Sequence, residues 1–245
     1  MQNVVLLVID VQRQYGRRLL GVGVYGSVAR GDARAHSDID MLVILRGSHR
    51  HSEARIADGV LVTFLVESPR EARDEVSKPR PDLCDVLAGW QSMRVLYDPL
   101  RLVATLRRKA RRPSRELFRK SARDALYGAA EDLGKLRNAL EAGDANDARE
   151  MAIWVSGAVV CALLSLCRIV VTGRRAFAAS RTIGPEGEAL WRLRYRDVVP
   201  GRMWPLADLV WSRLLDRADR DGIDVRQLRS LAPPGRASPR RPSRD

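Results

Sequence analysis

Hydrophobic residues in the first hundred positions gather in short runs that polar, glycine-containing turns separate. The runs are rich in valine, isoleucine and leucine and have the length of strands. Strands are expected at 20–26, 39–45, 59–67 and 93–99. Helical patterns follow at 83–90 and 99–112. This alternation of strands and helices predicts an α/β domain.

Two segments of this first region have a less distinct pattern. The apolar run at 1–18 fits a helix or a strand, because short apolar runs do not separate the two, and we favour a helix. The polar segment 46–58 is expected to be a connecting loop or a short helix.

Ser68 is a suitable N-cap residue, and Pro69 suits the first position of the helix that follows it.

The pattern changes to longer helices after about position 112. Ser114 is expected to cap a helix that Gly143 ends, and a second helix is expected from 147 to 173. This second helix holds seventeen uncharged residues at 151–167, close to the minimum length of a membrane span. Because amphipathic helices flank it, we interpret it as the central helix of a bundle. Further helices are expected at 185–196 and 204–222.

These patterns divide the chain into a first domain at 1–112, a helical domain at 113–230 and a tail at 231–245. A chain of 245 residues is long enough for two domains with separate cores. The tail is rich in proline, arginine and serine and cannot bury a core, so we expect it to be disordered.

Asp38 and Asp40 lie at the start of the second predicted strand. Because successive strand residues point to opposite faces, both carboxylates are expected on one side, where they repel each other unless a cation lies between them. Mg²⁺ or Mn²⁺ suits carboxylate and phosphate oxygens. In the preceding turn Gly26 lets a ligand approach the backbone, while Ser27 and Arg30 offer contacts to phosphate. The sequence therefore predicts a site for a metal-bound nucleoside triphosphate.

The stretch GSVARGDARAHSDIDMLV at 26–43 resembles the signature of the minimal nucleotidyltransferases of the DNA polymerase β superfamily. The resemblance implies an α/β (α+β) fold, with a small mixed sheet in an N-terminal nucleotidyltransferase domain and a C-terminal helical bundle like those of kanamycin-type and streptomycin-type enzymes. It also implies that an acceptor hydroxyl attacks the α-phosphorus, so that a nucleoside monophosphate, expected to be AMP, is transferred and pyrophosphate leaves. The implied nucleotide-binding residues are Gly26, Ser27, Arg30 and Ser37, and the implied catalytic and metal-binding residues are Asp38 and Asp40.

The chain departs from this family at one important position. Active members carry a third carboxylate on the following strand, and the residue that aligns there is Leu61, with Thr63 two positions further on. Asp58 and Glu67 flank that strand, and Asp85 on the next helix is a freer candidate. Two functions therefore stay open: an active nucleotidyltransferase, or a catalytically impaired module that binds nucleotide and metal as a sensor or as a partner in a complex.

The charge of the chain bears on its partners. Its 43 Lys+Arg and 30 Asp+Glu give a net charge of +13, which favours polyanionic partners. Aminoglycosides are polycations and suit this charge poorly, so a protein side chain or an RNA end is the favoured acceptor. A basic nucleic-acid binder that needs no metal is a third alternative, and it predicts a steep dependence of binding on salt.

The three cysteines fit a reducing cytoplasm. Cys84, Cys161 and Cys167 form no Cys-x-x-Cys pair, so neither a disulfide framework nor a zinc cluster is predicted. The apolar run at 1–18 has no basic segment before it, so we expect neither an export signal nor a membrane partner. The large share of apolar helix is consistent with a homodimer.

Overall fold

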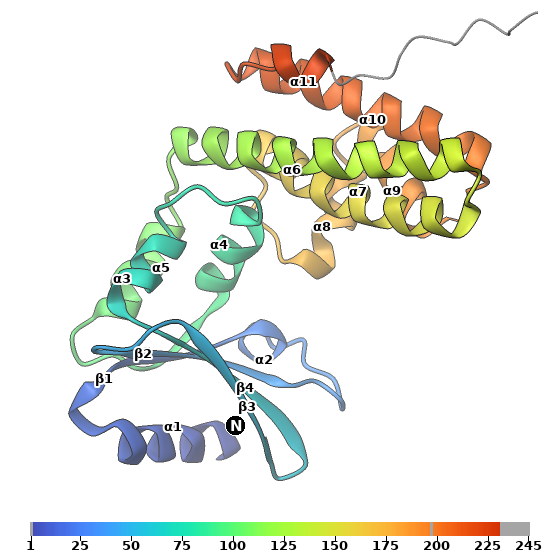
Figure 1. Ribbon diagram of the computed structural model, residues 1–245. Helices are drawn as coiled ribbons and strands as arrows, with labels where there is room; N and C mark the ends of the chain where they lie inside the picture. The colour runs from blue at the N-terminus through green and yellow to red at the C-terminus, as the bar shows by residue number, and fades with distance from the viewer. Residues whose placement is uncertain (1, 197, 231–245) are drawn as a thin grey trace, which may run out of the picture. The chain divides into compact units, whose positions relative to one another are not determined.

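The computed structural model describes residues 2–196 and 198–230 (Figure 1). Among these residues, 2–121 and 168–174 form one compact unit, and 122–167, 175–196 and 198–230 form the other. The first unit contains a five-stranded sheet and the second is helical, which confirms the predicted fold class. The domain limits at 1–112 and 113–230 stay predictions, and the tail at 231–245 lies outside the described residues.

The sheet of the first unit is mixed. Its strands are β1 (Leu19–Tyr25), β2 (Ile39–Leu45), β3 (His51–Ala57), β4 (Val60–Glu67) and β5 (Arg94–Tyr97). Their order in space is β3-β4-β2-β1-β5. Strands β2 and β4 are parallel, and the other neighbouring pairs are antiparallel. The carboxylate-bearing strand β2 therefore lies at the centre of the sheet, between β1 and β4.

Strand β3 corrects the prediction of a loop or short helix at 46–58. It pairs residue by residue with β4, from His51 opposite Val66 to Ala57 opposite Val60. As an edge strand it is exposed on both faces, so it shows no alternation of apolar and polar residues. The informative signal is the Asp58–Gly59 turn, where both residues have positive φ (50° and 75°), as two-residue hairpin loops require.

Short helices surround the sheet. They are α1 (Gln2–Tyr15), the 3-10 turn η1 (Gly16–Arg18), α2 (Gly26–Arg30), α3 (Pro69–Glu75), α4 (Leu83–Ser92) and α5 (Leu102–Ala110). The helix expected within 1–18 is thus confirmed. The predicted cap of α3 is also confirmed, because the Ser68 hydroxyl accepts a hydrogen bond from the Glu71 amide and the Glu71 carboxylate accepts one from the Ser68 amide.

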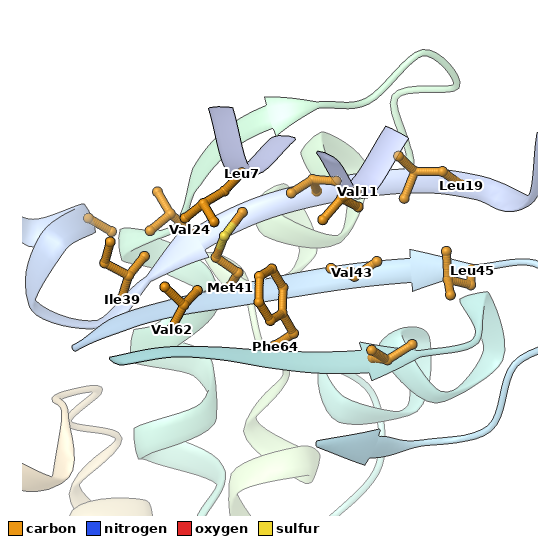
Figure 2. Packing of buried hydrophobic residues seen from close by; sticks show 13 residues of the cluster. Leu7, Val11, Leu19, Val24, Ile39, Met41, Val43, Leu45, Val62 and Phe64 are labelled. Carbon is orange, nitrogen blue, oxygen red and sulfur yellow. The ribbon is translucent and has the colours of Figure 1, made fainter. Parts of the chain in front are cut away.

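The two faces of the sheet have different chemistry. On one face, Leu7 and Val11 of α1 pack against Met41 and Val43 of β2 in a buried apolar cluster that also holds Phe64 (Figure 2). The residues between these in sequence point to the opposite face, because strand side chains alternate. Helices α3, α4 and α5 pack against that second face, and it carries the candidate site.

The helical region contains α6 (Arg115–Ala142), α7 (Ala145–Cys167), α8 (Gly173–Ser180), α9 (Pro185–Tyr195), α10 (Pro200–Arg220) and α11 (Arg226–Ser230). The Ser114 hydroxyl accepts a hydrogen bond from the Leu117 amide at 3.1 Å, as expected of the cap of α6. Helix α7 packs against α9 and α10. Among the described residues α7 is the one helix with the length and hydropathy of a membrane span, and 56% of its most apolar window is buried.

The helix predicted at 147–173 is too long. Helix α7 ends at Cys167, because Arg168 has a φ of 55° and a left-handed residue cannot continue a right-handed helix. An irregular segment follows, and α8 begins at Gly173. Residues 168–174 belong to the unit that contains the sheet.

Candidate nucleotide-binding site

The second face of the sheet borders a cavity of about 450 Å³. All of its lining residues belong to the first compact unit. The sheet and its turn contribute Tyr25, Gly26, Ser27, Arg30, Asp38, Asp40, Leu42 and Leu65. The opposite wall contains Arg50, Glu75, Arg80, Asp82, Asp85, Val86, Gly89, Trp90 and Met93, with Thr172 from just before α8 and Gly173 and Arg174 from its start. The cavity thus brings together the turn after β1 and the two aspartates, which the sequence predicts to form one site.

Gly26 brings the backbone of the turn against the Asp40 carboxylate. Its φ of 68° lies in the left-handed region, where glycine is favoured. A Cβ atom at this position would collide with Oδ2 of Asp40. The absence of a side chain therefore lets a main-chain segment and a carboxylate share one corner of the cavity.

Asp40 lies in the middle of the sheet and beside a second carboxylate. It pairs with Tyr25 of β1 on one side and with Thr63 of β4 on the other. Burial raises the pKa of Asp40, the charge of Asp38 raises it further, and the charge of Arg30 lowers it. A bound cation would favour the charged form of both carboxylates.

The remaining predicted nucleotide-binding residues lie in two different places. Ser27 is buried, and Arg30 reaches the carboxylate of Asp32 at 3.3 Å. Both line the cavity. Ser37 is not among the lining residues; its hydroxyl accepts a hydrogen bond from the Arg34 amide at 2.8 Å and holds the loop before β2. A nucleotide contact from Ser37 stays a prediction.

Strand β4 offers no carboxylate beside the aspartate pair. In the parallel register, Thr63 is the neighbour of Asp40 and Leu65 is the neighbour of Leu42. Leu61, the residue that aligns with the third carboxylate, is 43% exposed and does not line the cavity. Within 2–196 and 198–230, no group of three or more histidine, cysteine, aspartate or glutamate side chains is placed to hold a metal ion.

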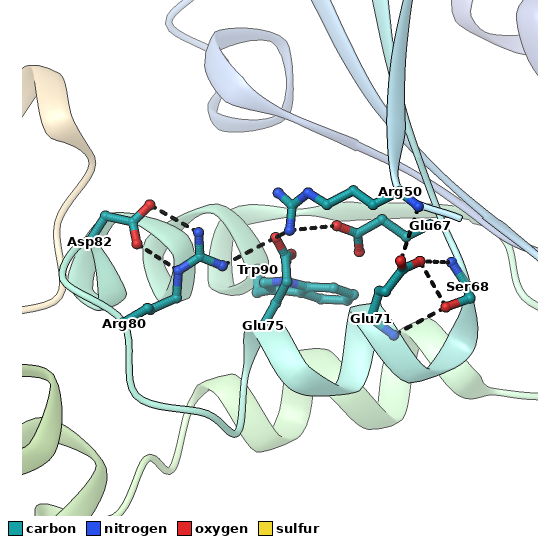
Figure 3. A network of polar contacts seen from close by, with 8 residues as sticks. All are labelled: Arg50, Glu67, Ser68, Glu71, Glu75, Arg80, Asp82 and Trp90. Atoms are coloured by element: carbon teal, nitrogen blue, oxygen red, sulfur yellow. Dashed lines mark hydrogen bonds and ion pairs between the residues drawn. The ribbon is translucent and has the colours of Figure 1, made fainter. Parts of the chain in front are cut away.

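A partly buried polar network that the sequence pattern does not indicate lies next to the site. Figure 3 shows Arg50 between two glutamates: its Nη1 atom is 3.1 Å from Oε1 of Glu67 and 2.8 Å from Oε1 of Glu75. Glu75 also accepts a hydrogen bond from the indole of Trp90 at 2.9 Å and lies 3.4 Å from Nη1 of Arg80. Sequence reasoning missed this network because its members lie on separate elements.

Glu67 is the most deeply buried carboxylate of this network. Its side chain has no exposed surface, and burial is the main cause that raises its pKa, with the charge of Glu75 as the second cause. The ion pair with Arg50 opposes this shift, but neither carboxylate oxygen makes a hydrogen bond of good geometry. Glu67 does not line the cavity, so it does not replace the family's third carboxylate.

Asp82 and Asp85 complete the carboxylates of the opposite wall. Arg80 binds Asp82 with two nitrogens, at 2.6 and 3.0 Å. Asp85 instead accepts a single hydrogen bond of 2.6 Å from the amide of Gly173, a neutral donor. Asp82 is thus held by a charged guanidinium, and Asp85 by a neutral main-chain amide.

Comparison with known proteins agrees with this geometry. The family model described as "Nucleotidyltransferase domain" matches residues 9–85. The crystal structure of a nucleotidyltransferase-like protein from Exiguobacterium sibiricum resembles this chain with a TM-score of 0.61, at 11% sequence identity, over 89% of this chain and 77% of that one. Identity this low supports the fold alone. No curated protein matches the chain significantly.

The matched residues contain the turn at Gly26 and Ser27 and both aspartates of the cavity. The resemblance drawn from residues 26–43 is thereby confirmed. The family model and the shared fold agree: residues 9–85 match a nucleotidyltransferase domain, and the chain has the fold of a nucleotidyltransferase-like protein.

Proposed function

We propose that the chain is a Mg²⁺-dependent nucleotidyltransferase that transfers a nucleoside monophosphate, AMP, to a hydroxyl acceptor and releases pyrophosphate. The observation that carries this proposal is the shared cavity of Gly26, Ser27, Arg30, Asp38 and Asp40 within a nucleotidyltransferase domain. Its volume of about 450 Å³ lies in the range of small-molecule and cofactor sites.

The donor set of the cavity fits a divalent cation. Asp38 and Asp40 are hard oxygen donors, and burial, followed by the charge of Asp38, raises the pKa of Asp40 even though the charge of Arg30 lowers it. Asp38 and Asp40 would hold Mg²⁺ or Mn²⁺. When bound, the ion supplies neutralisation of the phosphate charge and polarisation of the α-phosphate.

The other residues of the sheet wall would bind the triphosphate. Gly26 lines the cavity with its main chain, and Ser27, which also lines it, would offer its hydroxyl to phosphate oxygens. Arg30 supplies positive charge from the end of α2. In such a transfer, in-line positioning and neutralisation of charge account for most of the rate enhancement.

Asp85 is the carboxylate that we propose to orient the acceptor hydroxyl and accept its proton. Strand β4 provides only Thr63 and Leu65 beside the aspartate pair, and neither is a base at neutral pH. Asp85 lines the same cavity, and the amide of Gly173 holds one of its oxygens. This arrangement suits a positioned general base.

The alternative is a catalytically impaired module that binds nucleotide and metal as a sensor or complex partner. The observation that favours it is the lack of a carboxylate on β4 next to Asp40, where active family members carry one. This alternative predicts metal-dependent nucleotide binding with no turnover.

The test incubates the chain with Mg²⁺ and nucleoside triphosphates labelled at the α-phosphate. It measures the pyrophosphate released and, separately, the label transferred to protein or RNA. Asp38→Asn and Asp40→Asn are expected to lower release by at least about a hundredfold, because each removes a metal ligand. Asp85→Asn is expected to keep nucleotide binding and lose turnover. Asp58→Asn is the matched control, because Asp58 lies in the β3–β4 turn and tolerates a positive φ as asparagine.

Binding without release by the unaltered chain would support the sensor instead. Release that survives Asp38→Asn and Asp40→Asn would remove the proposed site. The remaining parts of the proposal are a protein side chain or an RNA end as acceptor, in agreement with the net charge of +13, and a cytoplasmic location.

A further inference from the structure

Strand β3 is an uncovered edge of the sheet. It is the terminal strand in the order β3-β4-β2-β1-β5. All of its side chains from His51 to Ile56 are exposed. Its register with β4 is continuous over seven pairs. A regular strand of this kind presents a row of main-chain N–H and C=O groups that no neighbouring strand of the sheet pairs.

Some of the usual protections of a sheet edge are missing from β3. Its sequence, HSEARIA, contains no proline or lysine, and its pairing with β4 shows no bulge; its charged residues are Glu53 and Arg55. Ile56 is 69% exposed and lies opposite Leu61, which is 43% exposed. The edge therefore carries unpaired main-chain groups beside an exposed apolar pair.

The charges of β3 are self-complementary. Glu53 and Arg55 flank Ala54 symmetrically, and they project to the same face because they are two residues apart. That face is the one with α1: the Tyr15 hydroxyl is 3.5 Å from Oε1 of Glu53, and the Arg55 guanidinium lies 4.7 Å from the ring centre of Phe64. Glu53 also lies 3.0 Å from Nε2 of His51 in the same strand. Both charged groups of β3 therefore lie on the α1 face of the sheet.

We propose that β3 pairs antiparallel with β3 of a second copy of this chain, with Ala54 opposite Ala54. This pairing would join the two sheets into one. Glu53 of each copy would then lie opposite Arg55 of the other, which makes two cross-strand ion pairs.

Other pairings are disfavoured by charge. An antiparallel pairing shifted by two residues places Glu53 opposite Glu53 or Arg55 opposite Arg55, and a parallel pairing in register does both. Antiparallel pairings shifted by one residue bring neither charge opposite its complement. The register centred on Ala54 is therefore specified by the sequence itself.

The experiment is a charge-reversal cycle measured by sedimentation velocity, without nucleotide and therefore independent of the proposed function. The unaltered chain is expected to associate to about twice its mass of 27.4 kDa. Glu53→Arg and Arg55→Glu each turn two attractive pairs into repulsive ones and are expected to raise the dissociation constant roughly tenfold or more. The double variant, Glu53→Arg with Arg55→Glu, restores both pairs and is expected to return within about threefold of the original constant.

Asp224 and Arg226 provide a matched control. They form an exposed ion pair of 2.6 Å with the same spacing of two residues, outside the sheet. Asp224→Arg and Arg226→Asp are expected to leave the association unchanged. Far-ultraviolet circular dichroism shows whether each variant is folded. If Arg55→Glu does not fold, the comparison of Glu53→Arg with the double variant still tests the pairing.

Three results would overturn this inference. A chain that stays monomeric at all concentrations lacks the interface. A dimer that survives both single reversals uses another surface. A double variant that dissociates as readily as the single variants shows that Glu53 and Arg55 do not face each other.

Discussion

At the scale of single residues, the site depends on how closely main chain and carboxylates approach each other. Asp40 is held between β1 and β4, and Gly26 lies against it without a side chain. Residue spacing and type were enough to predict this arrangement, because Gly26, Ser27, Asp38 and Asp40 lie within fifteen positions of one another. The polar partners of Glu67 were not predictable, because Arg50 and Glu75 come from other elements.

Gly26→Ala tests this close approach. The new Cβ meets the Asp40 carboxylate and sits at a positive φ, so we expect a loss of about 1 kcal/mol or more in the free energy of unfolding. We also expect Mg²⁺-dependent nucleotide affinity to fall by about tenfold. Thermal unfolding and equilibrium binding measure the two effects.

Gly59→Ala is the matched control for this substitution. Gly59 has a φ of 75°, close to that of Gly26, but nothing lies within 4 Å of an added Cβ. It carries the backbone strain without the collision, so it is expected to lower stability and leave nucleotide affinity unchanged. Equal affinity losses in the two variants would remove the argument for contact with Asp40.

At the scale of elements, most strands and helices follow from the sequence, and the exceptions have physical causes. Strand β3 escaped prediction because an edge exposed on both faces has no alternation of apolar residues. Helix α7 was predicted too long because the apolar pattern does not show the left-handed Arg168 that ends it. The cavity wall built from α4 and residues 172–174 was also not predicted, because Asp85 and Gly173 are 88 positions apart in the sequence.

Glu67, the last residue of β4, is expected to make the free energy of unfolding depend on pH. Burial raises the pKa of Glu67 from 4.5 to about 8, so the folded state binds a proton there that the unfolded state has released. Its contribution to stability is full below about pH 4.5 and is lost as the pH rises toward 8. The charged groups that face it are Arg50, Glu75 and Glu71.

Glu67→Gln removes this titration while keeping the shape of the protonated side chain. We expect the variant to lose the fall in the free energy of unfolding between pH 5 and 8, a fall of roughly 1 to 3 kcal/mol in the unaltered chain. Denaturant unfolding across this range measures it. Parallel curves for the two proteins would show that Glu67 is ionised throughout, with Arg50 as its counter-ion.

At the scale of the whole molecule, net charge and composition indicate less about the binding partner than the candidate site does. The net charge of +13 fits nucleotides, RNA and many other polyanions alike, and only the cavity with Asp38 and Asp40 selects among them. Binding through the aspartate pair is expected to depend on Mg²⁺, whereas binding through the arginines alone is expected to depend mainly on salt. This contrast separates a nucleotidyltransferase domain from a general basic surface.

The most direct measurement is calorimetric titration of the chain with a non-hydrolysable ATP analogue, with and without Mg²⁺, for the unaltered protein and for Asp38→Asn with Asp40→Asn. We predict that the unaltered chain binds the analogue with Mg²⁺ and loses at least about tenfold in affinity when Mg²⁺ is removed, because the carboxylates then repel the phosphates. We predict that the double variant shows no such dependence on Mg²⁺. Equal affinities with and without Mg²⁺ in the unaltered chain, or full Mg²⁺ dependence in the double variant, would contradict the assignment of these two aspartates.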